Sequence, residues 1–190
     1  MDTDKTRKFV VLGYRGVGKT SLILRYTENT FIENYYPTIE DAHWKTVKFN
    51  GITYRFNIID TAGQDEFSIL NSQYAIGIDM YVIVFSVASR LSFDMVHAIY
   101  NKILDQSGVD QIRMVLVGSK SDLVNQRQVT QEMALETAKE LNCKYIECSA
   151  KAEVNIDTIF EQAIQELEAT SQNSSQTDPK NPSAGGCIVM

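Results

Sequence analysis

Short apolar runs and helix-spaced apolar residues alternate along the chain and predict a regular succession of strands and helices. Apolar runs rich in β-branched residues predict strands over residues 8–12, 44–49, 52–59, 81–85, 114–117 and 144–147. Apolar residues three and four apart predict helices over residues 19–27, 91–105, 131–141 and 155–168. We therefore predict an α/β domain in which a six-stranded, mostly parallel sheet carries helices on both faces.

Two features modify this regular pattern. Asn50-Gly51 separates two predicted strands, and this dipeptide is a strong signal for a tight hairpin. The hairpin gives the sheet one antiparallel edge strand. Residues 28–39, which contain Pro37, and residues 61–74 show no periodicity, so both are predicted to be loops.

Composition and charge narrow the class of protein. A hydrophobic content of 44% is ordinary for a folded domain of 190 residues, and the net charge of −6 argues against nucleic-acid binding. The longest strongly apolar run, residues 80–85, is too short to span a bilayer, and the N-terminus resembles neither a secretory signal nor a myristoylation site. We therefore expect a reducing compartment, with Cys143 and Cys148 as buried thiols.

Residues 13–20 carry the first chemical motif. They fit G-x-x-x-x-G-K-[ST] and stand between a predicted strand and a predicted helix. Glycines let the backbone curl so that successive N–H groups face phosphate oxygens, and the helix N-terminus adds its dipole. Lys19 is predicted to bridge the outer phosphates and the Thr20 hydroxyl to bind Mg²⁺.

Three more polar segments follow predicted strands. Residues 60–64 read Asp-Thr-Ala-Gly-Gln, residues 117–122 read Val-Gly-Ser-Lys-Ser-Asp, and residues 148–151 read Cys-Ser-Ala-Lys. Asp60 is placed to hold Mg²⁺ through water, and Gly63 allows an N–H to reach a terminal phosphate. Because ligands bind at the carboxyl ends of strands in open α/β sheets, these segments are predicted to share one site.

The order of these motifs resembles the Ras family of small GTPases. GxxxxGK[ST], PTIE, DTAGQ, [NS]KxD and SAK occur in that family's order, and the resemblance covers residues 7–169. Arg15 and the final Cys-Ile-Val-Met are more like the Rheb branch. The resemblance implies a P-loop NTPase fold of the small G-domain type, with GTP or GDP and Mg²⁺ as ligands and slow GTP hydrolysis.

The same resemblance implies the roles of individual residues. Asp122 is expected to bind the guanine edge, with Lys120 and Phe31 on the two faces of the base and the backbone of residues 149–151 on its carbonyl. The implied nucleotide contacts are Arg15, Gly16, Val17, Gly18, Lys19, Thr20, Ser21, Phe31, Ile32, Tyr35, Pro37, Thr38, Gly63, Ser119, Lys120, Asp122, Ser149, Ala150 and Lys151.

Two loops resemble the family's switch segments. Thr38 is expected to bind Mg²⁺ with Thr20 and Asp60, and Gln64 to orient the attacking water. Gln64, Lys19 and Thr38 are thus the implied catalytic residues, and residues 61–74 are the second switch. The implied effector-facing residues are Tyr35, Tyr36, Pro37, Thr38, Ile39 and Glu40. Trp44 either packs on the sheet or belongs to that effector face.

Two departures from the family pattern carry consequences. Arg15 replaces a small glycine, so its long cationic side chain is expected to crowd Gln64 and slow hydrolysis. Ser119 stands where the family has Asn, and a hydroxyl makes fewer hydrogen bonds than an amide. Weaker nucleotide binding is expected, while Asp122 keeps the guanine preference.

The C-terminal region predicts a lipid anchor. The folded domain, residues 1–169, precedes a polar segment, residues 170–186, that is expected to be disordered. Residues 187–190 fit C-a-a-X with Met at the last position, which favours farnesyl on Cys187. One lipid with only Lys180 nearby gives marginal, reversible attachment. We expect the cytoplasmic face of endomembranes, with a cytosolic pool.

Partners and rival functions complete the prediction. The resemblance implies a monomer that meets a GTPase-activating protein (GAP), an exchange factor and a target-of-rapamycin-type kinase complex. An ATP-using P-loop enzyme shares residues 13–20 but leaves Asp122 and residues 149–151 unexplained. A scaffold that holds GTP with negligible hydrolysis is the alternative suggested by Arg15 and Ser119.

Overall fold

Strands and helices alternate along the chain in the computed structural model, which describes residues 5–34, 36–64, 74 and 76–174. The strands are β1 (Lys5–Gly13), β2 (Glu40–Phe49), β3 (Ile52–Thr61), β4 (Met80–Ser86), β5 (Met114–Ser119) and β6 (Lys144–Glu147). The helices are α1 (Lys19–Glu28), α2 (Arg90–Ser107), α3 (Gln131–Glu140) and α4 (Ile156–Ser174), with a 3₁₀ turn η2 (Val124–Gln126).

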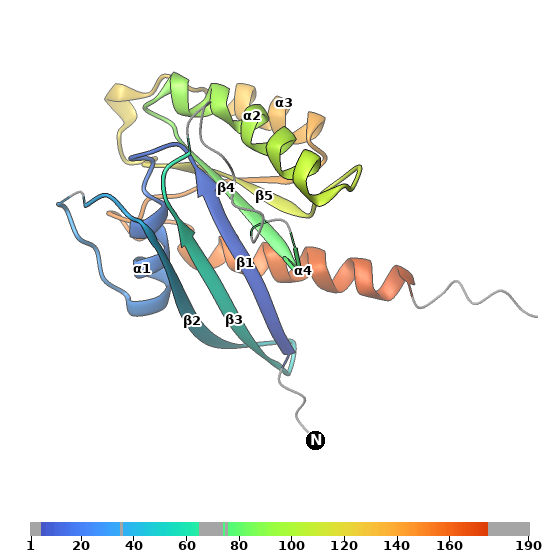
Figure 1. Ribbon diagram of the computed structural model, residues 1–190. Coiled ribbons are helices and arrows are strands. Elements are labelled where there is room, and N and C mark those ends of the chain that lie inside the picture. Colours follow the sequence, from blue (N-terminus) through green and yellow to red (C-terminus); the bar gives the residue numbers. More distant parts are fainter. Residues whose placement is uncertain (1–4, 35, 65–73, 75, 175–190) are drawn as a thin grey trace, which may run out of the picture.

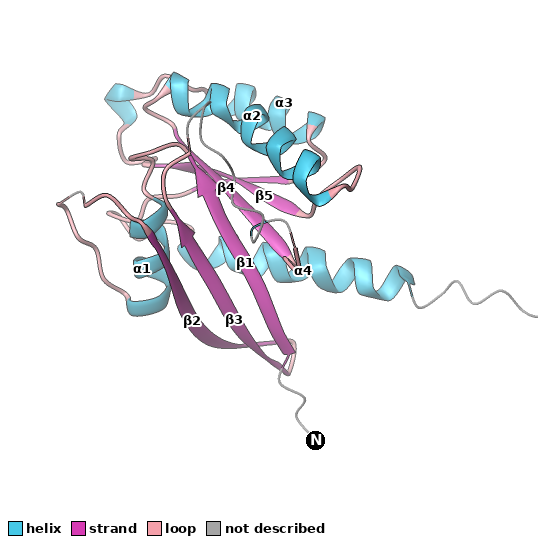
Figure 2. Cartoon of the chain, in the orientation of Figure 1, coloured by secondary structure: helices cyan, strands magenta, loops and turns pink. Residues whose placement is uncertain are grey.

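The six strands form one sheet with the order β2-β3-β1-β4-β5-β6 (Figures 1 and 2). The β2–β3 pair is antiparallel, and the other neighbouring strands run parallel. The predicted fold class is therefore confirmed. Because the parallel strands share one direction, the loops that follow β1, β3, β5 and β6 come together at one edge of the sheet.

The core lies in two layers on opposite faces of the sheet. Helices α1 and α4 pack on one face, where the rings of Tyr26 and Phe160 stack with centroids 3.8 Å apart. Helices α2 and α3 pack on the other face, where Phe93 meets Phe85 of β4 with centroids 4.9 Å apart. The central strands are buried on both faces, which explains their continuous apolar runs.

Most element boundaries lie within three residues of the predictions, and two differ by more. β2 begins at Glu40 instead of residue 44, because pairing with β3 extends into a polar, exposed segment that shows no apolar alternation. Helix α4 continues to Ser174, beyond the predicted end at residue 168 and into the segment expected to be disordered. Extending an existing helix adds one hydrogen bond per residue, so polar residues continue it at little cost.

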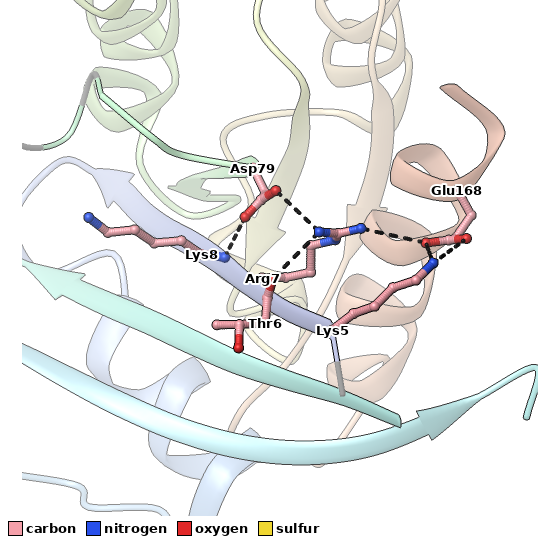
Figure 3. Close-up of polar contacts among 6 residues, drawn as sticks. All are labelled: Lys5, Thr6, Arg7, Lys8, Asp79 and Glu168. Atoms are coloured by element: carbon pink, nitrogen blue, oxygen red, sulfur yellow. Dashed lines mark hydrogen bonds and ion pairs between the residues drawn. The ribbon is translucent and has the colours of Figure 1, made fainter. Parts of the chain in front are cut away.

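Ion pairs fasten the start of β1 to its neighbours (Figure 3). Glu168 of α4 lies 3.3 Å from Lys5 Nζ and 3.8 Å from Arg7 Nη2. Asp79, just before β4, lies 3.8 Å from Arg7 Nη1 and accepts a 2.8 Å hydrogen bond from the Lys8 main-chain N–H. This end of the sheet is opposite to the edge where the predicted site residues gather.

Candidate functional site

The loop after β1 carries the predicted phosphate-binding motif. β1 ends at Gly13 and α1 begins at Lys19, so residues 14–18 form a short loop at a helix N-terminus. A Cβ atom at Gly13 would lie 2.1 Å from the main-chain oxygen of Val84, so a larger residue does not fit. The loop N–H groups and the helix dipole make this edge of the sheet suited to an anion.

A cavity of about 1060 Å³ lies at this edge, a volume that suits a nucleotide-sized ligand. The predicted nucleotide contacts that line it are Arg15, Gly16, Val17, Gly18, Lys19, Thr20, Ser21, Phe31, Ile32, Pro37, Thr38, Gly63, Ser119, Lys120, Asp122, Ala150 and Lys151. Ser149 and Gln64 do not line it in the described structure, and Tyr35 lies outside the described residues.

Lys19 is held over the loop by two main-chain oxygens. Its Nζ donates to Gly13 at 3.1 Å and to Tyr14 at 3.2 Å, and the residue is 6% exposed. Burial lowers the pKa of Lys19 to about 8, and the charge of Asp60 opposes this shift. An anion bound in the cavity would favour the charged ammonium, so Lys19 is suited to hold phosphate.

Three oxygen-bearing side chains from three separate segments meet beside Lys19. Thr20 Oγ1 donates to Asp60 Oδ2 over 2.6 Å and lies 2.7 Å from Thr38 Oγ1. The Thr20 hydroxyl has one proton, so when it donates to Asp60 the Thr38 hydroxyl must be the donor to Thr20. The first switch loop is therefore closed onto the phosphate-binding loop through Thr38.

The same three side chains fit a magnesium ion. Asp60 is buried, and its Oδ1 has no hydrogen-bond partner among the described residues. Burial raises the pKa of Asp60, and a cation beside the carboxylate would counter that effect. Within the described ranges, no group of three or more His, Cys, Asp or Glu side chains could hold a metal. A site of one carboxylate and two hydroxyls suits Mg²⁺, which keeps waters and phosphates as further ligands.

The other end of the cavity is built from the loops after β5 and β6. Asp122 accepts a 2.5 Å hydrogen bond from the Ser149 hydroxyl, which also accepts the Ala152 main-chain N–H at 2.9 Å. Lys120 has a φ of 59°, unusual for a residue with a side chain, and its Nζ donates to the Gly16 main-chain oxygen at 2.7 Å. Ser149 therefore orients the carboxylate of Asp122 from just outside the cavity.

Ser119 ties the loops together. Its Oγ lies 2.6 Å from the main-chain oxygen of Val17 and 2.8 Å from that of Phe85, and the side chain is buried. The hydroxyl therefore joins the phosphate-binding loop to the end of β4. A hydroxyl has one proton, so it satisfies one of these two carbonyl oxygens at a time.

Arg25 is a residue that the sequence predictions missed. From α1, its Nε donates to the Ala150 main-chain oxygen at 2.9 Å, and its Nη1 lies 2.6 Å from Glu153 Oε1. The guanidinium carbon also lies 5.9 Å from the centre of the Phe31 ring. Arg25 thus links two segments of the cavity wall. A basic residue in an amphipathic helix is a weak signal for a site residue, because the charged ends of many such side chains lie in solvent.

The second switch begins as an extension of β3 toward the phosphate-binding loop. The Gln64 main-chain N–H donates to the Gly13 oxygen over 2.9 Å. A Cβ atom at Gly63 would lie 2.4 Å from Arg15 Cα, so the two backbones are in contact. The Gln64 side chain is 6% exposed and donates to the Ala62 oxygen over 3.0 Å. Gln64 is not among the residues that line the cavity, so its water-orienting role stays a prediction.

The predicted effector-facing residues are largely solvent-exposed. Ile39 is 90% exposed and Tyr36 is 70% exposed, and Pro37 is also exposed. Glu40 accepts a 2.5 Å hydrogen bond from the Tyr74 hydroxyl. Large apolar side chains exposed beside a ligand cavity are typical of a binding surface.

Several predictions fall outside the described residues. They are the role of Tyr35, the second-switch residues 65–73, the disorder of residues 175–186 and the lipid site at Cys187. In the part of the chain that the structure describes, no helix combines the length and apolarity required of a membrane span.

A small G domain of the P-loop NTPase class is defined by three features together: the strand order, the phosphate-binding loop after β1 and the loops after β5 and β6. Comparison with known proteins supports this assignment. The Ras family profile matches residues 8–169. The chain is 47% identical to the small monomeric GTPase RhbA of Aspergillus fumigatus over 188 residues, covering 98% of this chain and 97% of that protein.

Two further relatives point to one branch. The chain is 46% identical to the GTP-binding protein rhb1 of Schizosaccharomyces pombe, with 97% of each chain covered. It is 40% identical to the GTP-binding protein Rheb of Homo sapiens, covering 93% of this chain and 96% of that protein. The chain therefore belongs to the Ras family of small GTPases and is Rheb-like.

Proposed function

We propose that this chain is a molecular switch that binds GTP and GDP with Mg²⁺ and hydrolyses GTP slowly. The observation that carries the proposal is the contact of Thr20 with both Thr38 and Asp60. It closes a partner-facing loop onto the phosphate-binding loop at the place where a metal and a terminal phosphate fit. Loss of that phosphate would release Thr38 and change the exposed surface.

The chain's own residues divide the work along the cavity. Main-chain N–H groups of residues 14–18 and the Lys19 ammonium hold phosphate oxygens. Thr20, Thr38 and Asp60 are the residues that would hold Mg²⁺, which when bound neutralises charge on the phosphates. These groups position the nucleotide, and positioning accounts for much of the catalysis of phosphoryl transfer.

Guanine preference is assigned to Asp122. Its carboxylate is an acceptor, oriented by Ser149, and suits the N–H groups on one edge of guanine. Adenine presents no such pair of donors there. The backbone of residues 149–151 and the side chains of Lys120 and Phe31 would complete the base site.

The C-terminal Cys187 is proposed to carry a prenyl group, so that the switch acts reversibly on the cytoplasmic face of endomembranes. Its proposed partners are a GAP, an exchange factor and a target-of-rapamycin-type kinase complex in growth signalling, with the switch itself monomeric. The exposed side chains of Tyr36 and Ile39 support a protein partner at the first switch.

A GTP-binding scaffold with negligible hydrolysis is the second candidate. The observation that favours it is the buried Gln64 side chain, which bonds to Ala62 and leaves the cavity without this water-orienting amide. The two candidates share every binding residue and differ in whether Gln64 can turn toward the phosphate.

The deciding experiment uses the full chain freed of nucleotide. Labelled GDP should be displaced by GTP and GDP but not by ATP, and chelation of Mg²⁺ should speed its release. Single-turnover assays should show slow but measurable GTP hydrolysis, whereas tight binding without turnover would leave the scaffold. Asp122→Asn is the matched variant. It should weaken guanine binding and favour xanthine nucleotides, because xanthine carries an oxygen acceptor where guanine has an amino group.

A further inference from the structure

The side chain of Tyr145 packs against the end of β5, just before the loop that carries Asp122. Tyr145 belongs to β6, which pairs with β5, and a Cβ atom at Gly118 would lie 2.5 Å from the Tyr145 hydroxyl oxygen. The Tyr145 ring is also nearly parallel to that of Phe85 on β4, with centroids 6.1 Å apart and 12° between the planes. Because position 118 is a glycine, the hydroxyl can lie against the β5 backbone one residue before Ser119.

An ion pair fixes the Tyr145 hydroxyl at this place. The hydroxyl donates to Glu147 Oε1 at 2.8 Å, and Arg127 donates to the same carboxylate with Nη1 at 2.8 Å and Nη2 at 2.7 Å. Hydrogen bonds from Arg127 lower the pKa of Glu147, whereas burial and the hydrogen bond to Glu147 raise the pKa of Tyr145. The carboxylate is therefore ionised at neutral pH and the tyrosine keeps its proton, so this hydrogen bond has a charged acceptor and is stronger than a neutral one.

The main chain beside this contact joins two loops of the nucleotide cavity. Glu147 is the last residue of β6, and Cys148, which follows it, lines the cavity. The Cys148 N–H donates to the Gly118 oxygen at 2.8 Å, and the Cys148 oxygen accepts the Ser121 N–H at 3.0 Å. Any shift of Glu147 or Gly118 is therefore shared by the loops after β5 and β6.

We propose that Tyr145 is a positioning residue for guanine recognition. Its hydroxyl holds the loops after β5 and β6 at the spacing at which Ser149 can orient Asp122. Tyr145 does not line the described cavity itself, so it acts through its neighbours Gly118 and Glu147 and not on the nucleotide. The inference deepens the proposed function and rests on the guanine preference assigned there to Asp122.

The hydrogen bond between Ser149 and Asp122 makes this spacing critical. At 2.5 Å it stands at the short end of the range for a hydroxyl donor, and such bonds weaken steeply when their geometry is bent. Loss of the Tyr145 hydroxyl would weaken the support of Glu147 and leave space beside Gly118 into which the loop after β5 can move. Asp122 would then be less strictly oriented, and a base that offers it two donors would lose more than a base that offers one.

The test compares GDP with inosine diphosphate, whose base lacks the amino group of guanine and offers Asp122 one donor fewer. The full chain is freed of nucleotide, and each affinity is measured by displacement of a fluorescent GDP analogue. Tyr145→Phe removes only the hydroxyl and should weaken GDP binding about fivefold and inosine diphosphate binding about twofold, values within the range of one net hydrogen bond. The preference for GDP should therefore fall by about 2.5-fold, whereas a merely structural role would weaken the binding of both nucleotides equally.

Two further variants show where the hydroxyl acts. Glu147→Gln keeps the size of the side chain but removes its charge, so it should lower the GDP preference as well. Tyr145→Phe should then add less in the Glu147→Gln chain than in the unmodified chain, because both changes affect one contact. Tyr54→Phe is the matched control: Tyr54 is buried and pairs with Lys5 at the opposite end of the sheet, so loss of its hydroxyl should leave the GDP preference unchanged.

Three outcomes would overturn the inference: an unchanged GDP preference in Tyr145→Phe, an equal fall in Tyr54→Phe, or fully additive effects of Tyr145→Phe and Glu147→Gln. Circular dichroism and chemical denaturation show whether each variant is folded. The unmodified chain is measured first with GDP and ADP. Equal affinity for these two nucleotides would refute the proposed function and this inference with it, whereas a normal guanine preference in every variant would overturn this inference alone.

Discussion

The hydroxyl oxygen of Ser119, at the end of β5, lies 2.6 Å from the main-chain oxygen of Val17 in the phosphate-binding loop. The same hydroxyl lies 2.8 Å from the Phe85 oxygen. Ser119 therefore stabilises the cavity as a link between loops. Its one proton can be donated to only one of these two oxygens at a time.

Replacing Ser119 by Asn should slow nucleotide release. An amide has two N–H donors and can reach both carbonyl oxygens, and one added hydrogen bond of about 0.5–1.5 kcal/mol corresponds to roughly two- to tenfold. The dissociation of a fluorescent GDP analogue measures the effect. Ser119→Ala is the control and should release nucleotide faster. Equal rates for Asn, Ala and the unmodified chain would refute the link.

Removing the Arg25 side chain should speed nucleotide release. Arg25→Ala frees the Ala150 main-chain oxygen and the Phe31 ring, so two segments of the cavity wall lose a common support. A charge-assisted hydrogen bond is worth about 1.5 kcal/mol or more, so release should rise roughly tenfold.

Glu153→Gln is the matched control for Arg25→Ala. It removes only the exposed ion pair to Arg25, which contributes little in solvent, and should change release by less than about twofold. GDP dissociation is compared for both variants at equal ionic strength. A larger effect at Glu153 than at Arg25 would contradict the assignment.

Shortening Arg15 should accelerate GTP hydrolysis. The Arg15 backbone touches Gly63, next to Gln64, and its guanidinium lies over the Tyr14 ring at 5.5 Å. Arg15→Gly opens space beside residues 63–64 in which the Gln64 amide can turn toward the phosphate. An increase of about tenfold, equivalent to roughly 1.4 kcal/mol, is expected in single-turnover assays. Arg15→Lys keeps a long cation and should stay slow; no gain in Arg15→Gly would argue for the scaffold.

Nucleotide affinity should fall as the pH rises from 7 to 9. Burial lowers the pKa of Lys19 to about 8, so in the free protein the Lys19 ammonium loses its proton near that pH. A bound phosphate favours the charged ammonium, so Lys19 stays protonated in the complex. Binding near pH 8 should therefore take up a proton, which calorimetry in buffers of different ionisation enthalpy detects. Lys19→Arg stays charged throughout and should show no such uptake.

The same pKa shift has a consequence for stability. Unfolded chain keeps the Lys19 proton up to its ordinary pKa of 10.5, whereas the folded protein releases it from about 8. The unfolded state therefore binds more protons between these values, and the contribution of Lys19 to the free energy of unfolding rises with pH across this window. Chemical denaturation of the nucleotide-free protein at several pH values, with Lys19→Arg alongside, measures it.

Element ends that coincide with a change in the apolar pattern were predicted closely, and ends that continue into polar sequence were not. β6 has the predicted bounds, residues 144–147, and α1 differs from its prediction by one residue. β2 starts at Glu40 because backbone pairing with β3 continues where side chains are polar. Its first residues carry no apolar pattern, so periodicity could not reveal them.

In the candidate site, too, local sequence patterns predicted some features and missed those that depend on tertiary packing. The order of the motifs predicted that Lys19, Thr20 and Asp60 would meet, because parallel strands bring their carboxyl ends to one edge. It did not predict that the Gln64 side chain would be buried and bonded to the Ala62 oxygen, since a side-chain rotamer depends on packing by neighbouring loops.

By itself, the sequence determined the fold class and the sheet's antiparallel edge and proposed the residues that carry the chemistry, because periodicity and motif spacing are local properties of the chain. Only the tertiary structure decided that Ser119 bonds to Val17 and Arg25 to Ala150, pairs that are 102 and 125 residues apart. It also decided that the Arg55 guanidinium lies over the Trp44 ring. Such contacts follow from strand order and register, which join distant segments through packing that no local pattern encodes.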